Sequence, residues 1–294
     1  MKKIDLTGRV AVVTGAGNGL GRAHALMLAK RGAKVIVNDL AGGGEAAASV
    51  AAEIVRSGGE AAADSSNVGD VAQAHTIIAT AIEKFGRIDI LVNNAGNLRD
   101  RTFLKLDMSD FDLVIRVHLL GSAYCTKAAW PHMKEQGYGR VVMTTSGAGL
   151  YGNFGQTNYG AAKMGLVGLM NVLKLEGLRH GILVNTVSPT AATQMTAEML
   201  SGEMAAVLKP EFVSAAVTYL SSDSCTLTGQ ILSAGGGHFA VARVLESRGI
   251  YVDPAADPDP DVIAERYGEI SDFTDPVFLG SSQDLIQKLT AGAN

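Results

Sequence analysis

Cysteine and tryptophan are scarce in this sequence, which has 2 cysteines and 1 tryptophan among its 294 residues. Cys125 and Cys225 lie far apart and lack the paired spacing of a metal site, so both are expected to be buried, reduced thiols. We therefore expect no metal, no disulfide framework, and a reducing compartment, the cytoplasm.

Long apolar runs and clusters of positive charge are also missing. No run approaches the roughly 20 apolar residues that a membrane-spanning helix needs. Asp5 and Gly8 interrupt any secretory segment behind Lys2 and Lys3. A net charge of −4 without a basic patch argues against nucleic acid and against an anionic membrane surface. The expected partner is a small-molecule substrate.

Apolar residues, by contrast, make up 47% of the chain, enough for a sizeable core. Short buried-strand patterns alternate with helical patterns along the sequence. The expected strands are 9–14, 33–38, 60–64, 88–92, 140–145, 182–188 and 230–234; the expected helices end at Lys30 or span 44–57, 70–85, 109–136 and 158–180. This alternation predicts an α/β fold with a Rossmann-type, doubly wound parallel sheet. We expect one domain over 1–237 and a C-terminal extension over 238–294.

A glycine-rich loop follows the first strand and precedes the first helix, which is the setting that a dinucleotide-binding loop requires. Glycines let the backbone approach a pyrophosphate, and the helix N-terminus offers unpaired amides. A tight turn is the alternative reading of the glycines alone. The residues expected to contact the cofactor here are Gly15, Asn18, Gly19, Leu20 and Gly21.

Asp39 ends the second strand, where a carboxylate accepts hydrogen bonds from ribose hydroxyls and repels a 2′-phosphate. The loop has no arginine at Gly17 or Asn18 to bind such a phosphate. The sequence therefore predicts NAD rather than NADP as the cofactor. A helix N-cap is the alternative role for Asp39.

The ends of the next two strands supply further candidate cofactor contacts. Asn67 and Val68 follow the third strand, where an adenine would lie, although Asn67 could equally cap the next helix. Asn94, Ala95 and Gly96 follow the fourth strand, and such small residues suit a backbone that passes close to a cofactor.

The candidate catalytic groups are a tyrosine and a lysine one helical turn apart, Tyr159 and Lys163. An unperturbed phenol has a pKa of ~10, and we expect the neighbouring ammonium to lower it and make Tyr159 a usable base. Ser146 ends the preceding strand, where its hydroxyl can bind a substrate oxygen. Without the other motifs, a tyrosine and a lysine at this spacing would indicate only an exposed face of a helix.

Taken together, these motifs resemble the short-chain dehydrogenase/reductase family over about residues 6–237. They are Thr14-Gly15-x-x-x-Gly19-x-Gly21, Asn93 to Gly96, Ser146, Tyr159-x-x-x-Lys163 and Thr228-Gly229-Gln230. The resemblance implies hydride transfer between a secondary alcohol and a nicotinamide cofactor, with Lys163 also holding the nicotinamide ribose. It further implies a homodimer or homotetramer.

Within the family, the chain is most similar to the dehydrogenase region of the peroxisomal type 2 multifunctional β-oxidation enzymes. The similarity lies in Leu98–Arg101, Arg116–Leu119, Tyr151–Gln156 and Asn158–Lys163. It implies oxidation of (R)-3-hydroxyacyl-CoA to 3-ketoacyl-CoA. The alternatives are a dehydrogenase of free hydroxysteroids, an NADPH-linked 3-oxoacyl reductase, which Asp39 disfavours, and an NAD-binding regulatory protein without turnover.

Two positions depart from the family pattern. His118 stands where most members have a catalytic asparagine, and both a catalytic and a packing role remain open for it. Pro189-Thr190 replaces the usual Pro-Gly, and a one-residue deletion then places Thr193 at the family's nicotinamide-binding threonine. Pro189 and Thr193 are therefore expected cofactor contacts.

The extension contains a proline-rich acidic segment, 253–260, and a helix-like stretch, 284–289. It could cover a long acyl pocket, reach a neighbouring subunit, or simply pack on the surface. Ala293-Asn294 does not match a peroxisomal targeting signal. We expect these 294 residues to hold neither the hydratase nor the sterol-carrier domain of the multifunctional enzymes.

Overall fold

The computed structural model describes residues 3–40, 44–193, 202–257 and 259–291. Ala293 and Asn294 lie outside these ranges. The chain divides into two compact units, residues 1–241 and 242–294.

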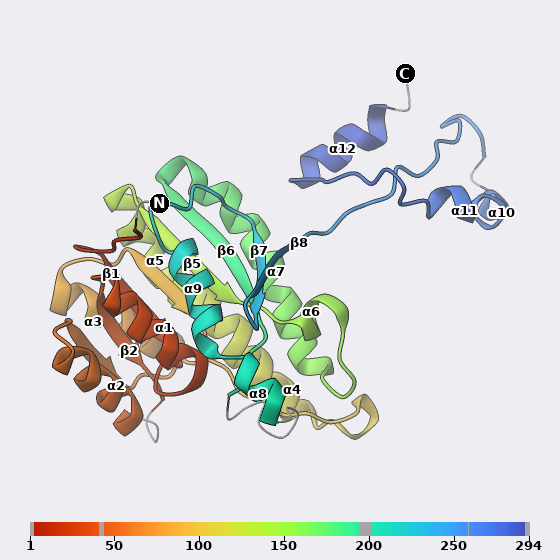
Figure 1. The fold of residues 1–294 in the computed structure, drawn as a ribbon. Helices are drawn as coiled ribbons and strands as arrows, with labels where there is room; N and C mark the ends of the chain where they lie inside the picture. Colours follow the sequence, from red (N-terminus) through yellow and green to blue (C-terminus); the bar gives the residue numbers. More distant parts are fainter. Residues whose placement is uncertain (1–2, 41–43, 194–201, 258, 292–294) are drawn as a thin grey trace. The chain divides into compact units, whose positions relative to one another are not determined.

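The first unit is built on an eight-stranded sheet with the order β3-β2-β1-β4-β5-β6-β7-β8 (Figure 1). The strands are β1 Val10–Thr14, β2 Lys34–Asn38, β3 Ala61–Asp64, β4 Ile90–Asn93, β5 Gly139–Thr144, β6 Ile182–Pro189, β7 Ile231–Gly235 and β8 His238–Ala242. The pairs from β3 through β7 are all parallel. The predicted doubly wound sheet is confirmed.

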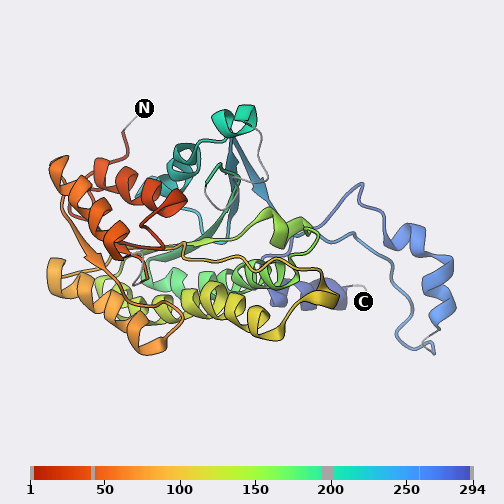
Figure 2. The ribbon, with the colours of Figure 1, turned by 90° about the horizontal axis from the view of Figure 1, so that it is seen from below.

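Two layers of helices cover the sheet (Figure 2). One layer holds α1 Gly19–Lys30, α2 Gly44–Arg56 and α9 Pro210–Leu220; the other holds α3 Val71–Phe85, α5 Gly121–Gln136 and α7 Thr157–Gly177. Shorter helices are η1 Phe103–Lys105, α4 Met108–Ile115, η2 Arg116–Leu120, α6 Gly147–Tyr151, η3 Leu178–His180 and α8 Gly202–Val207. No described helix is long and apolar enough to cross a bilayer.

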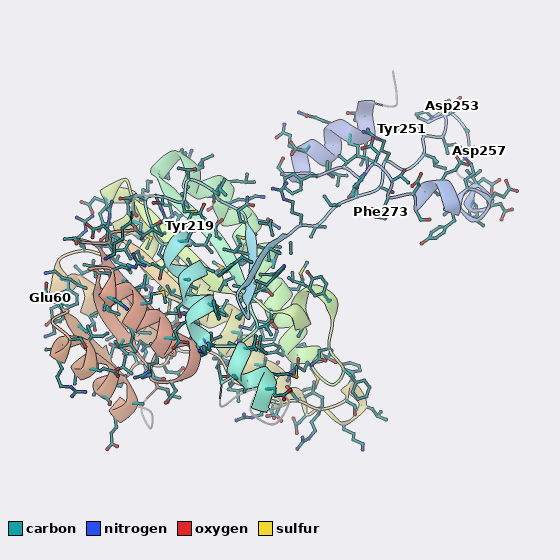
Figure 3. The ribbon with its side chains drawn as sticks, in the orientation of Figure 1. Glu60, Tyr219, Tyr251, Asp253, Asp257 and Phe273 are labelled. Atoms are coloured by element: carbon teal, nitrogen blue, oxygen red, sulfur yellow. The ribbon has the colours of Figure 1, made fainter. Side chains whose placement is uncertain are left out.

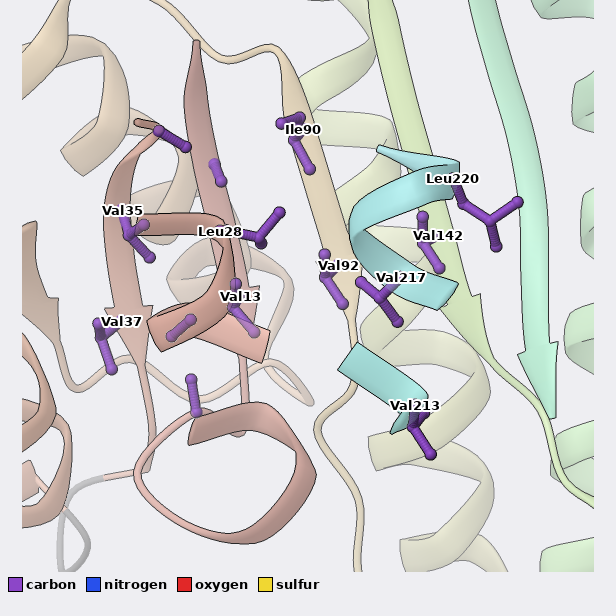
Figure 4. Packing of buried hydrophobic residues seen from close by; sticks show 14 of the residues in the cluster. Val13, Leu28, Val35, Val37, Ile90, Val92, Val142, Val213, Val217 and Leu220 are labelled. Carbon is purple, nitrogen blue, oxygen red and sulfur yellow. The ribbon is translucent and has the colours of Figure 1, made fainter. Parts of the chain in front are cut away.

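The packing of helices against the sheet explains why the sequences of the central strands are continuous apolar runs. All five residues of β1 are buried, because helices cover both of its faces. Leu28 of α1 and Val217 of α9 belong to one cluster with β-strand valines such as Val92 (Figure 4). This packing holds α1, and with it the glycine loop, against the centre of the sheet.

Several elements differ from the sequence-based prediction. The edge strand β8 was not predicted, because its side chains are mostly exposed and leave no buried-strand pattern. The predicted helix 109–136 consists of α4 and α5 joined by the π-helical turn η2. The helix α9 was also not predicted, although its Val213, Val217 and Leu220 recur at helical spacing.

The second unit holds α10 Pro260–Glu265, α11 Tyr267–Ile270 and α12 Ser282–Ala291, the last of which covers the predicted helical stretch. Reciprocal backbone hydrogen bonds join Glu246 to Val277, and Lys288 Nζ lies 3.1 Å from a carboxylate oxygen of Glu246. Tyr251 and Phe273 of this unit are more than half exposed (Figure 3).

Candidate active site

A cleft of about 250 Å³ opens at the carboxyl ends of the central strands. It lies where the strand order reverses between β1 and β4, the usual place for a ligand in an open parallel sheet. Its lining residues are Gly15, Asn18, Gly19, Leu20, Gly21, Asp39, Asn94, Gly96, His118, Thr144, Tyr159, Lys163, Pro189 and Thr193. All of these except Thr144 are residues that the sequence analysis singled out.

The glycines of the loop between β1 and α1 serve different purposes. A Cβ on Gly21 would lie 2.1 Å from Gly15 O, and one on Gly15 would lie 2.7 Å from Ala95 Cα. These two glycines are therefore required by close backbone packing within the protein. A Cβ on Gly19 would meet Thr193 at 3.6 Å, an ordinary van der Waals distance, and the positive φ of 53° is what favours glycine at this position.

The start of α1 is suited to an anionic group. Its N-cap residue, Asn18, makes no side-chain capping hydrogen bond, so that side chain satisfies none of the first-turn amides. Across the cleft, Thr144 Oγ1 is buried without a hydrogen-bond partner in the described part of the chain. Uncapped amides and a buried free hydroxyl fit a polar, phosphate-bearing ligand such as a dinucleotide.

Asp39 lines the cleft beside the glycine loop. Its Oδ2 accepts a hydrogen bond from Gly17 N at 2.8 Å, and its Oδ1 accepts one from Leu40 N at 2.9 Å. A Cβ on Gly17 would lie 2.6 Å from Oδ2, so the carboxylate rests directly against the loop. This geometry places a negative charge next to the dinucleotide-type turn.

Asn94 and Thr14 tie the loops after β1 and β4 together. Asn94 Nδ2 donates to Thr14 O and Gly15 O, both at 3.0 Å. Thr14 Oγ1 accepts from the main-chain amides of Asn94 and Ala95 at 3.0 and 3.1 Å. Asn94 thus holds the walls of the cleft in addition to lining it. Thr14 entered the sequence analysis only as part of the glycine-loop motif, and its contacts with the loop after β4 could not be predicted from that motif.

Four predicted site residues do not line the cleft: Asn67, Val68, Ala95 and Ser146. Val68 is buried, and its side chain packs against Gly121. Asn67 Oδ1 accepts from Gly69 N, while the N-cap of α3 is Asp70. The alternative of Asn67 as the helix cap is therefore wrong.

Lys163 is buried in α7 with 3% of its surface exposed. Its Nζ donates to Thr144 O at 2.6 Å and lies 5.3 Å from the centre of the Tyr159 ring. Burial lowers the pKa of Lys163 to about 7. The structure therefore brings the predicted amine and phenol together, in surroundings that disfavour the charged form of the amine.

The pKa of Tyr159 differs from the expectation. It is raised above 10, chiefly because burial disfavours the phenolate, and the charge of Asp100 acts in the same direction. A hydrogen bond with Ser146 is the opposing influence. The expected lowering of this pKa by Lys163 is therefore not found in the protein alone, where burial of the phenol sets the direction of the shift.

Ser146 takes its place at the end of β5 by capping α6. Its Oγ accepts from Ala148 N at 3.2 Å, which fixes the side chain at the start of that helix. The Ser146 side chain also lowers the pKa of Tyr159, which places the two hydroxyls near each other. A serine and a tyrosine at neighbouring positions can together hold and deprotonate an alcohol.

The segment before η1 is joined to the N-terminus of α7. Asn158 Nδ2 donates to Arg99 O at 3.0 Å, and its Oδ1 accepts from Tyr159 N at 2.8 Å. Gln156 Nε2 donates to Asp100 Oδ2 at 2.7 Å. These contacts fix the first turn of the helix that carries the phenol.

Among the described residues, no group of three His, Cys, Asp or Glu side chains could hold a metal ion.

The model of the short chain dehydrogenase family matches residues 9–203. The chain is 46% identical over 289 residues to "Peroxisomal multifunctional enzyme type 2" of Drosophila melanogaster, a match that covers 95% of this chain and 48% of that protein. It is also 46% identical to a short-chain type dehydrogenase/reductase of Mycobacterium tuberculosis, over 90% of this chain and 95% of that one. The chain therefore spans about half of the multifunctional relative.

Solved structures agree with these relationships. The full-length Drosophila enzyme superposes with a TM-score of 0.85 at 38% identity, over 99% of this chain and 50% of that one. A 7α-hydroxysteroid dehydrogenase, solved with NADH and 7-oxo glycochenodeoxycholic acid, superposes with a TM-score of 0.74 at 29% identity, over 79% and 95% of the two chains.

The relatives also correct the predicted location. Several proteins that are 41–46% identical to this chain are named as peroxisomal enzymes. The cytoplasmic location inferred from scarce cysteine is therefore wrong, because cysteine content reports redox conditions and not the organelle.

The matched family model, the 46% identical relatives and the strand-end cleft agree on one assignment. The chain belongs to the short-chain dehydrogenase/reductase family.

Proposed function

We propose that this protein is an NAD-dependent dehydrogenase that oxidises the hydroxyl of (R)-3-hydroxyacyl-CoA to give 3-ketoacyl-CoA. The observation that carries the proposal is the meeting of Ser146, Tyr159 and Lys163 beside a cleft that ends at the uncapped N-terminus of α1. The similarity to the type 2 multifunctional enzymes supports the acyl-CoA substrate.

The cofactor would be held by the residues of the cleft. The α1 N-terminus and the backbone at Gly19 would receive the pyrophosphate, and Asp39 would receive the adenosine ribose and repel a 2′-phosphate. When bound, NAD supplies the acceptor for the hydride that leaves the carbinol carbon. The solved 7α-hydroxysteroid dehydrogenase complex with NADH supports this choice.

Side chains of the protein would remove the proton of the substrate hydroxyl. Ser146 would hold the substrate oxygen while Tyr159 takes the proton of the hydroxyl. Tyr159 must be a phenolate for this step, and two groups in the site favour that form: the Ser146 hydroxyl and the Lys163 amine in its charged state.

The test is an assay of NADH formation with the purified protein. The substrates are (R)- and (S)-3-hydroxyacyl-CoA thioesters of several chain lengths, a steroid side-chain CoA thioester and free hydroxysteroids, each with NAD and with NADP. We expect the highest kcat/KM for an (R)-hydroxyacyl-CoA with NAD. A preference for free steroids would replace the proposed substrate, and NAD binding without any turnover would support a regulatory protein.

We also propose that the protein forms a homodimer or homotetramer. Large apolar side chains are exposed on one of its longest helices: Met164, Val172 and Leu175 of α7 are 40%, 55% and 56% exposed. Self-association would cover these residues. The mass in solution, measured by light scattering, tests this proposal. The function of the extension, over an acyl pocket or toward a neighbouring subunit, stays a prediction.

A further inference from the structure

His118 stands in the π-helical turn η2, between α4 and α5. Gly121 N donates to Arg116 O, five residues back, so the turn is wider than an α-helical one. The His118 side chain lines the cleft, yet the residue is only 2% exposed. Single π-turns within helices frequently occur at functional sites, which directs attention to the contacts of this imidazole.

The first contact is with the backbone of Asn97. His118 Nε2 lies 3.0 Å from Asn97 N and 2.8 Å from Asn97 O. One ring nitrogen can accept from the amide or donate to the carbonyl, depending on the tautomer. In either tautomer the imidazole is bound to the backbone that follows β4 and forms one wall of the cleft.

The second contact explains the glycine at position 96. A Cβ on Gly96 would lie 2.2 Å from His118 Cε1, and its three nearest atoms would all belong to the His118 ring. The backbone of Gly96 does not have a positive φ, so conformation alone does not demand glycine there. Gly96 and His118 therefore form a matched pair.

The third contact is with the phenol. The rings of His118 and Tyr159 stand edge to face, with centroids 5.2 Å apart. His118 Nδ1 is buried and has no hydrogen-bond partner among the described residues. Burial lowers the pKa of His118 to about 3, so the ring is neutral at ordinary pH. The ring thus offers Tyr159 a packing surface, while its bonded nitrogen is occupied by the backbone.

We propose that His118 is a positioning residue that fixes the Gly96–Asn97 backbone on one side and the Tyr159 ring on the other, and that Gly96 is its obligate counterpart. This assignment distinguishes His118 from a proton-transfer group. Only the kinetic test of this proposal, the kcat of the His118 variants, rests on the proposed function.

The glutamine and asparagine variants separate the two roles. A glutamine amide reaches the place of Nε2 and carries both a donor and an acceptor, whereas an asparagine amide reaches only the place of Nδ1. We expect H118Q to keep kcat within about threefold, and H118N and H118A to lose roughly ten- to hundredfold, as for a misplacement on the order of 1 Å. The exposed histidine variant H75Q is the matched control. Activity kept by H118N and lost by H118Q would overturn the proposal.

Amide hydrogen exchange at Asn97 gives a readout that needs no turnover. We expect slow exchange of this amide in the wild type and H118Q, and faster exchange in H118N and H118A, because loss of the hydrogen bond to either the amide or the carbonyl of Asn97 loosens this backbone. If no substrate is oxidised, the proposed function fails, but exchange still decides the role of His118. Equal exchange in all four proteins would contradict it.

A double mutant tests the matched pair. We expect G96A to lose kcat/KM and thermal stability, and G96A/H118A to recover stability relative to G96A, because the obstructing ring is gone. The control is G168A on α7, where a Cβ would meet nothing within 4 Å. If G96A/H118A were less stable than G96A by the full loss of stability seen in H118A alone, the two residues would be independent.

Discussion

Lys163 Nζ donates a 2.6 Å hydrogen bond to the main-chain oxygen of Thr144, at the end of β5. That bond aims the amine of α7 at the strand end, 5.3 Å from the centre of the Tyr159 ring. The pair of residues therefore joins the helix that carries the phenol to the sheet that forms the floor of the cleft.

The buried state of Lys163 predicts a pH-dependent stability. Its pKa falls from 10.5 to about 7 in the folded protein, so between these values the unfolded chain binds a proton that the folded chain has lost. The contribution of Lys163 to the free energy of unfolding must therefore rise with pH across this window. Relative to K163M, we expect the wild type to gain on the order of 2 kcal/mol from pH ~6.5 to pH ~9.

Urea unfolding of both proteins at the two pH values measures this difference. Because the other titrating groups are common to both proteins, comparison with K163M isolates the lysine. A difference that does not change with pH would mean that Lys163 keeps its ordinary pKa in the folded protein.

Asp39 should determine the choice between NAD and NADP. In D39S the negative charge next to Gly17 is removed, while a hydroxyl remains that can accept from the loop. We expect the ratio of kcat/KM for NAD over NADP to fall by roughly tenfold or more, a change of about 1.4 kcal/mol in relative binding. Initial rates with both cofactors provide the measurement. The charge-keeping variant D39E is the control, and an unchanged ratio in D39S would assign the selectivity to other residues.

Gly21 should tolerate no side chain. In G21A the new methyl group would meet Gly15 O at 2.1 Å and Asn94 Nδ2 at 2.6 Å, so the clamp between the two loops must shift. We expect a loss of about 1–3 kcal/mol in the free energy of unfolding, together with weaker NAD binding. Thermal unfolding with and without NAD measures both. G168A serves again as the control, and wild-type stability in G21A would show that the loop is looser than this packing implies.

Most of the sheet and the outline of the cleft could be predicted from the sequence, because both depend on local patterns. The buried strands are continuous apolar runs, and Gly15 to Gly21 occupy one unbroken loop. Contacts between distant segments could not be predicted in this way. The hydrogen bonds of Thr14 to the loop at Asn94, and the fit of His118 against Gly96, arise only after β1, β4 and η2 are packed together.

The direction of the pKa shift at Tyr159 also needed the structure. Spacing along a helix predicts that Lys163 is near, but not that desolvation sets the direction of the pKa shift at both groups. Edge elements such as β8 escaped prediction for a different reason, since their exposed side chains carry little periodic signal.

The most direct test of the account is the rate of NADH formation from (R)-3-hydroxyacyl-CoA by the wild type and by Y159F. The variant keeps the ring that packs against His118 but loses the hydroxyl that titrates beside Ser146. With Y151F, an exposed tyrosine, as the control, we expect kcat in Y159F to fall by roughly 10²–10⁴-fold while NAD still binds. Wild-type turnover in Y159F would contradict the assignment of Tyr159 as the proton-transfer group, and with it the proposed mechanism.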